Sequence, residues 1–181
     1  MKHLLLLAAA SASLAGCMST ADGGQTSMGR GMAAGDLTPE DRMNYVRLAG
    51  ASDLFEIQSS QLALSRGQRA ETRQYAQMLV THHTQTTQAT MAAARAAGMN
   101  PPPPMLLPMQ QQMLDQLRRA SVANFDRVYM TQQIPAHEMA LTLHNNYAAN
   151  GDTPSLRATA ATALPLVRQH LDEARRMRGM M

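Results

Sequence analysis

Four side chains that could bind a metal ion fall at matching heights on segments with helical patterning. His137 and His170 lie about equally far, in opposite directions, from the predicted turn between their helices. Glu56 and His83 flank an earlier turn in the same way, within one or two helical turns of each other. Antiparallel helices joined by short turns would bring such positions together. One carboxylate and three imidazoles from four helices would suit a divalent transition metal ion.

The same side chains also have a purely structural interpretation, which the sequence alone favours. A histidine on an apolar stripe is usually hydrogen-bonded at the boundary of the core. Glu56 and His83 would then be a buried polar pair that fixes the register of two helices. Di-iron oxidase chemistry is not expected, because bundle di-iron centres use Glu-x-x-His motifs and no Glu here is followed by His three residues later.

Asp126 and Tyr129 are further polar residues on the helix that carries His137. Asp126 and His137 are separated by roughly 16 Å along a straight helix, so they cannot bind the same ion. We interpret Asp126 and Tyr129 as partners in hydrogen bonds between helices.

Methionine is unusually frequent, with 16 in the chain. Met105, Met109 and Met113 recur every four residues. Thioethers are soft ligands that select Cu(I), but methionine is also an ordinary gap-filling residue of protein cores. Core packing is the interpretation that the sequence favours.

The N-terminus has the pattern of an exported protein. Residues 1–16 combine a positive head, a short apolar run and small residues, which is typical of a cleaved secretory signal. The run is too short to span a bilayer permanently. Leu14 to Cys17 resembles the lipobox of bacterial lipoproteins, which implies cleavage before Cys17 and a lipid anchor on its thiol. By the same resemblance, Met18 favours the outer membrane, with the protein facing the periplasm.

The rest of the chain divides into a tether and one helical domain. Residues 17–37 are rich in Gly, Ser and Ala and predict a flexible linker, and residues 38–178 predict the folded domain. Apolar periodicity predicts long helices over residues 39–66, 69–97, 108–149 and from 154 onward. Pro135 predicts a kink or break near residues 131–135. Four amphipathic helices without a strand pattern predict an all-α four-helix bundle.

Charge and motifs exclude several classes of function. The net charge is only +3, the arginines are scattered, and no nucleic-acid-binding module is present, so no nucleic-acid partner is expected. No Gly-x-Ser-x-Gly elbow or phosphate-binding glycine loop is present either, so an enzyme is not expected. Protein partners stay open, including a homo-oligomer.

Five segments together resemble one bacterial envelope family. The segments are Phe55 to Ile57, Tyr75 to His83, Phe125 to Met130, His137 with Glu138, and Leu164 to Leu171. The family is domain of unknown function 4142, and the resemblance covers about residues 43–177. It implies a ferritin-like fold and no particular activity. The motif positions that it implies are Glu56, His83, Asp126, Tyr129, His137 and His170. His82 and His144 look additional, and Pro135 departs from the polar residue expected there.

The sequence therefore predicts a ferritin-like helical bundle anchored to the outer membrane, with a role in binding or in envelope stress and maintenance. The alternative is a periplasmic protein that binds or sequesters a transition metal such as copper, zinc or iron. Glu56, His83, His137 and His170 are its candidate ligands.

Lipidation should depend on Cys17, because the chain has no other thiol. We expect Cys17→Ser to abolish incorporation of a fatty-acid probe in cells, while the wild-type chain incorporates it. Normal labelling of the Cys17→Ser chain would contradict the prediction.

Overall fold

The computed structural model describes residues 37–181 of the chain. The predicted signal peptide, Cys17 and nearly all of the predicted tether lie outside the described residues. The helical elements are α1 (Arg42–Arg66), α2 (Ala70–Ala96), α3 (Pro108–Arg119), the short 3₁₀ helix η1 (Val122–Asn124), α4 (Phe125–Asn150) and α5 (Pro154–Gly179). No residue of the described region lies in a β-strand.

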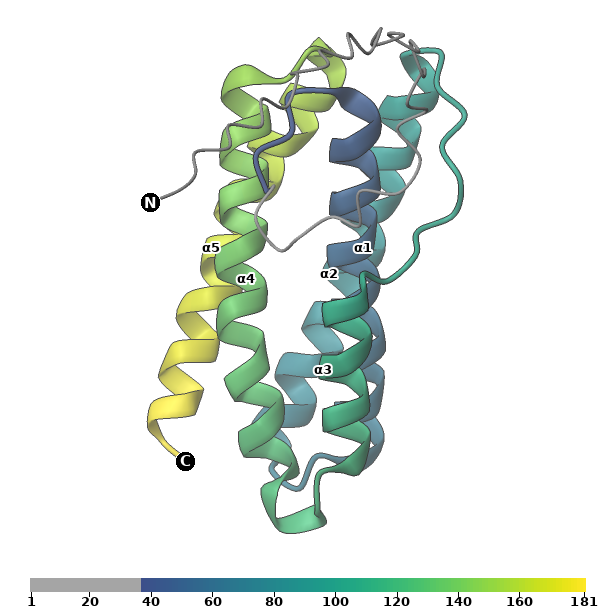
Figure 1. The fold of residues 1–181 in the computed structure, drawn as a ribbon. Helices are drawn as coiled ribbons and strands as arrows, with labels where there is room; N and C mark the ends of the chain where they lie inside the picture. The colour runs from purple at the N-terminus through teal and green to yellow at the C-terminus, as the bar shows by residue number, and fades with distance from the viewer. Residues whose placement is uncertain (1–36) are drawn as a thin grey trace, which may run out of the picture. The chain divides into compact units, whose positions relative to one another are not determined.

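Four of these helices form a bundle (Figure 1). α1 packs against α2 and α4, and α5 packs against α4 and α2. The shorter α3 lies on the outside, against α1 and α4. The predicted all-α, four-helix bundle is therefore confirmed. None of the described helices combines the length and the apolar character needed to cross a membrane.

The predicted helix ends agree with the structure at α2 and α5, but the predicted start of the first helix is wrong. The apolar periodicity predicts a helix that begins at residue 39. The helix begins at Arg42 instead, because the carboxylate of Asp41 accepts a hydrogen bond from the backbone N–H of Asn44 at 2.9 Å. Asp41 thus satisfies a donor of the first turn, as an N-cap residue does.

The prediction of one long helix over residues 108–149 is also wrong. The chain leaves the helix after Arg119 and resumes as α4 at Phe125, so the interruption lies well before Pro135. Pro135 lies inside α4, which continues through it. Pro135 is exposed, and one missing backbone hydrogen bond is tolerated at this position.

An arginine from α1 contacts both sides of the interruption after α3. The guanidinium of Arg66 donates hydrogen bonds to the carbonyl oxygens of Leu117, Arg118 and Ala120, at 3.2, 2.7 and 2.6 Å. Carbonyls at a helix end have no partner within the helix. Arg66 also lies 4.8 Å from the centre of the Phe125 ring, at the start of α4. This one side chain therefore stabilises both sides of the break.

The core has apolar residues at both ends of the bundle and polar residues between them. One buried cluster contains Tyr45, Ala94, Leu143, Tyr147 and Leu156 among its members. The other contains Ala63, Tyr75, Leu79, Phe125 and Ala174. Each of the four bundle helices contributes residues to both clusters and carries one buried polar candidate residue at a position between them. These residues are Glu56 on α1, His83 on α2, His137 on α4 and His170 on α5. They form a polar layer across the middle of the bundle.

Asp126, the second residue of α4, caps the start of α2. Its carboxylate accepts hydrogen bonds from the backbone N–H groups of Gln68 and Arg69, at 2.9 and 2.8 Å. It also accepts one from the hydroxyl of Thr72, at 3.2 Å. A buried carboxylate with three donors holds the two helix ends together. The expected role of Asp126 in a helix-to-helix hydrogen bond is confirmed.

We expect Asp126→Ala to lower the free energy of unfolding by roughly 1–3 kcal/mol, because it removes a cap and leaves buried donors unpaired. Urea unfolding monitored by circular dichroism measures this. Asp115→Ala is the matched control, since the half-buried Asp115 only accepts hydrogen bonds from Gln111 and Arg118 on its own helix α3; it should cost about 0–1 kcal/mol. Equal losses for the two variants would contradict the prediction.

Candidate metal centre

Three buried histidines from three helices meet in the polar layer. They are His83 of α2, His137 of α4 and His170 of α5. One ring nitrogen from each lies within 4.8 Å of those of the other two. The ring centroids are 5.2 to 5.6 Å apart, so the rings form a nearly equilateral triangle. We call these three residues the histidine triad.

The protonated nitrogen of His137 follows from its hydrogen bond. Nδ1 of His137 lies 2.8 Å from the carbonyl oxygen of Gln133, one turn earlier on α4. A carbonyl oxygen can only accept, so Nδ1 carries the proton and donates it. The lone pair of a neutral His137 is therefore on Nε2, a buried atom with no hydrogen-bond partner in the described part of the chain.

His83 is held by a carboxylate that the sequence analysis missed. Nδ1 of His83 lies 2.8 Å from Oδ1 of Asp53, one helical turn before Glu56 on α1. The other oxygen of Asp53 accepts hydrogen bonds from the hydroxyls of Thr86 and Thr87, at 3.0 and 2.9 Å. Carboxylates in this position commonly fix the ring of a metal-binding histidine and leave its other nitrogen free. Nε2 of His83 has no partner within residues 37–181.

His170 is held by its neighbour His82. Nε2 of His170 lies 2.9 Å from Nδ1 of His82, and the two rings stack with an interplanar angle of 11°. His82 is half-buried, whereas His170 is fully buried. Nδ1 of His170 has no partner among the described residues. His82, which the sequence analysis treated as additional, therefore contacts the triad directly.

Glu56 lies beside the triad without belonging to the tight group of nitrogens. Its Oε1 is 3.7 Å from Nδ1 of His137, and both of its carboxylate oxygens are buried without a hydrogen-bond partner in the described region. Burial raises the pKa of Glu56 to about 8. A buried carboxylate with no donor is costly when ionised, so Glu56 is neutral near pH 7 unless a cation approaches.

The pKa values of the three triad histidines are shifted in different directions. Burial lowers the pKa of His137 to about 3 and that of His170 to about 2, so both are neutral imidazoles at neutral pH. Burial also disfavours the charged form of His83. The hydrogen bond and negative charge of Asp53 outweigh that effect and raise the pKa of His83 above its usual value. Neutral imidazole is the form that binds metal ions.

The donor set fits a transition-metal cation. The triad presents the unpartnered atoms Nε2 of His83, Nε2 of His137 and Nδ1 of His170, next to the unpartnered carboxylate of Glu56. Each unsatisfied buried polar atom costs about 1–3 kcal/mol, and a cation among them would satisfy several at once. Imidazole nitrogens suit zinc, copper, iron and nickel, whereas magnesium and calcium prefer oxygen ligands.

The other predicted motif residues lie elsewhere. Asp126 caps α2, and the hydroxyl of Tyr129 lies 2.7 Å from that of Ser60 on α1. His144 is also outside the triad, and its Nδ1 lies 3.1 Å from the hydroxyl of Tyr45. Burial lowers the pKa of His144 to about 4. The one signal that could have revealed Asp53 is its place on the apolar face of α1, one turn before Glu56.

The fold and the triad define an all-helical bundle protein with buried histidines at its centre. The chain belongs to the family described as domain of unknown function (DUF4142), whose model matches residues 27–177. The family resemblance predicted from the sequence is confirmed. No curated protein matches the chain in sequence.

Solved structures with the same fold include copper-bound ones. The structure titled "CopM in the Cu(I)-bound form" is 18% identical with a TM-score of 0.65, covering 76% of this chain and 94% of that one. CopM in the Cu(II)-bound form is 18% identical with a TM-score of 0.64, covering 77% and 97%. A DUF305 fragment from Deinococcus radiodurans is 15% identical with a TM-score of 0.68, covering 80% and 98%. At these identities the likeness shows the fold.

Replacing Asp53 should change the titration of His83 in the metal-free protein. In Asp53→Asn the negative partner is lost and burial dominates, so the pKa of His83 should fall below its usual value of about 6.5. The raised pKa of the wild type stabilises the fold below the unfolded pKa, and this contribution is lost as pH rises through the folded pKa. In Asp53→Asn, the stability of the fold should therefore not fall as the pH rises through the range in which the wild-type His83 loses its proton. Imidazole chemical shifts followed against pH by NMR measure the effect; an unchanged titration of His83 would refute it.

Proposed function

We propose that this chain is a metal-binding protein whose histidine triad holds a transition-metal ion. The observation that supports this most is the meeting of three buried histidines from α2, α4 and α5, with one ring nitrogen of each within 4.8 Å of the others. Each ring also has a buried nitrogen without a hydrogen-bond partner in the described part of the chain. A purely structural triad would be expected to pair these atoms with one another or with other donors, because unpaired buried polar groups are destabilising. The neutral state of His137 and His170 also favours metal binding.

Glu56 is the proposed fourth ligand. Its carboxylate is as buried as the triad and has no hydrogen-bond donor within the described residues. A bound cation would favour its ionised form, which offers an oxygen donor. The ion would give the carboxylate of Glu56 and the ring nitrogens of the triad a common partner. Three imidazoles and one carboxylate are a donor set that accepts zinc or copper(II).

Copper is the first ion to test. The titles of the CopM structures name Cu(I) and Cu(II), and CopM shares this fold. Its low sequence identity gives no assignment of ligands, so the choice rests on the chemistry of the imidazoles. Zinc is the comparison ion, because it prefers the same nitrogen donors.

We further propose that the domain works in the cell envelope. This part of the proposal is supported by the lipobox-like sequence that ends at Cys17. An acylated Cys17 would hold the domain at the outer membrane, facing the periplasm, and metal binding there would serve sequestration or envelope maintenance. The proposal assigns no catalytic reaction.

Loss of a triad histidine should remove the metal and keep the fold. We expect His137→Ala and His170→Ala, purified without a histidine tag, to bind Cu(II) and Zn(II) at least about 10- to 100-fold more weakly than wild type. Equilibrium dialysis with metal analysis measures the affinity, and circular dichroism checks that helicity is retained.

His144→Ala is the matched control for these variants. His144 is also a buried, neutral histidine of α4, but it bonds to Tyr45 and lies outside the triad. It should bind metal like the wild type. If the wild type takes up neither ion at micromolar concentration, or if His144→Ala loses metal as the triad variants do, the proposal fails.

A further inference from the structure

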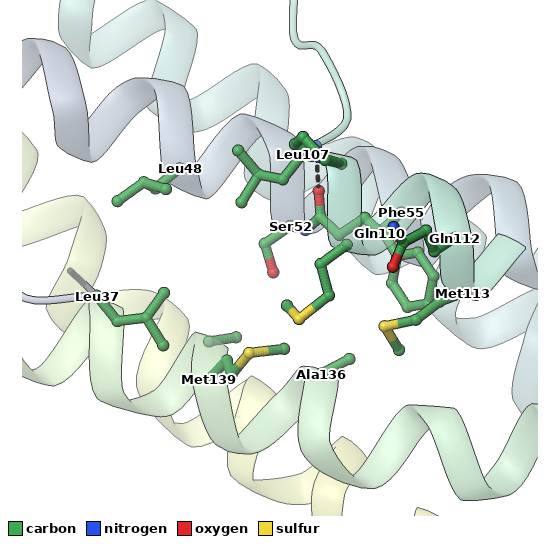
Figure 2. A pocket seen from close by; sticks show the side chains of 13 residues that line it. Leu37, Leu48, Ser52, Phe55, Leu107, Gln110, Gln112, Met113, Ala136 and Met139 are labelled. Carbon is green, nitrogen blue, oxygen red and sulfur yellow. Dashed lines mark hydrogen bonds between the residues drawn. The ribbon is translucent and has the colours of Figure 1, made fainter. Parts of the chain in front are cut away.

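A second site with different donors lies on the other side of α1 and α4. A cavity of about 290 Å³ is enclosed by α1, α3 and α4 (Figure 2). Its lining includes Met109 and Met113 of α3 and Met139 of α4. We call it the methionine pocket. Phe55 and Ala136 also line it, while their chain neighbours Glu56 and His137 belong to the polar layer.

The methionines of this pocket come from two facing walls. Met109 and Met113 are four residues apart on α3, so they lie on the same face of that helix. Met139 comes from α4. Figure 2 shows Met113 and Met139 extending into the space from opposite sides. All three side chains are half-buried. The pocket therefore gathers three thioethers at a place that is neither core nor open surface.

The remaining lining makes the pocket a soft and uncharged environment. Among residues 37–181, no Asp, Glu, Lys or Arg lines it. Its polar groups are those of Ser52, Gln110 and Gln112, and the side-chain oxygen of Gln110 already accepts a hydrogen bond from the backbone of Leu107 at 2.8 Å. Hard cations that need several oxygen ligands find few here.

We propose that the methionine pocket is a Cu(I) site, in which the thioethers of Met109, Met113 and Met139 bind the ion. Thioethers are soft ligands and prefer Cu(I) to zinc and to the hard cations. The uncharged lining suits a monovalent ion, which brings less charge into an apolar pocket than a divalent ion does. The site is separate from the histidine triad, and its test does not depend on the triad binding metal.

The three methionines of the pocket are only half-buried, although Met113 also packs against the small apolar cluster of Phe55, Leu114 and Ala136. Met130 and Met177 are almost fully buried within an apolar cluster, as gap-filling residues are. By contrast, the side chain of Met105 is 74% exposed. Met43, Met91 and Met105 line a neighbouring groove, which shares Leu107 and Pro108 with the methionine pocket. Met91 packs against the apolar cluster that contains Tyr45, whereas Met43 and Met105 are exposed soft donors next to the pocket.

An apolar small molecule is the competing occupant, because a cavity of this size could also hold one. Substitution of methionine by leucine separates the two. Leucine keeps a similar volume and the apolar surface but removes the sulfur. A Cu(I) site would lose its ligands in such a variant, whereas a pocket for an apolar molecule would keep its affinity.

The test uses the full chain with Cys17→Ser, so that the thiol cannot bind copper. Cu(I) is titrated under reducing, oxygen-free conditions in competition with a chromogenic Cu(I) chelator, and Ag(I) serves as a redox-inert probe. We expect the combined variant Met109→Leu, Met113→Leu and Met139→Leu to bind Cu(I) and Ag(I) at least about 10- to 100-fold more weakly than the parent chain. The control removes as many sulfur atoms outside the pocket, through Met78→Leu, Met180→Leu and Met181→Leu. It should bind like the parent.

Further measurements keep the two metal proposals distinguishable. His137→Ala should keep the Cu(I) and Ag(I) affinity of the pocket even if it loses Cu(II), and circular dichroism checks the fold of each variant. Three results would overturn the Cu(I) proposal: no binding of either ion by the parent chain, equal binding by the pocket variant and the parent, or equal losses in the pocket variant and its control. If the pocket variant fails to fold, the single variant Met139→Leu replaces it and should still weaken binding.

Discussion

The rest of the structure depends on how four helices bury a layer of imidazoles and carboxylates. Such groups are stable in a core only where partners compensate for lost hydration. Asp53 provides this for His83, and the Gln133 carbonyl provides it for His137. The apolar clusters above and below the layer supply the packing that the layer lacks. Helix register follows from this arrangement, because a shift of one turn would put a polar group into an apolar cluster.

Polar contacts between distant segments hold the ends of the bundle in the register that this layer needs. Asp126 joins α4 to the start of α2, and Arg66 joins the end of α1 to the break between α3 and α4. Both lie at the same end of the bundle, close to the short connection between α1 and α2. Each satisfies backbone groups that helix ends leave unpaired. The helices that carry the histidine triad and line the methionine pocket are therefore positioned by contacts of Asp126 and Arg66, which belong to neither candidate site.

The bundle and much of the candidate site could be predicted because helical periodicity and short turns fix which positions face each other. The distances of His137 and His170 from their shared turn were enough to pair them. The distance from a turn did not point to Asp53, whose signal is its place on the apolar face of α1, one turn before Glu56. The break before α4 was missed because Arg66, which binds the carbonyl oxygens at the end of α3, is far away in the sequence. The chain does not break at Pro135, because α4 continues through this residue.

The contact between His82 and His170 has a consequence beyond holding a ring in place. Only one of the two facing nitrogens, Nε2 of His170 and Nδ1 of His82, can carry the shared proton when both rings are neutral. A cation bound at Nδ1 of His170 would leave the proton on Nε2 of that ring, and His82 would then adopt the tautomer protonated at its outer nitrogen. The tautomeric state of a half-exposed side chain on α2 would in this way be coupled to the occupancy of a centre that solvent does not reach.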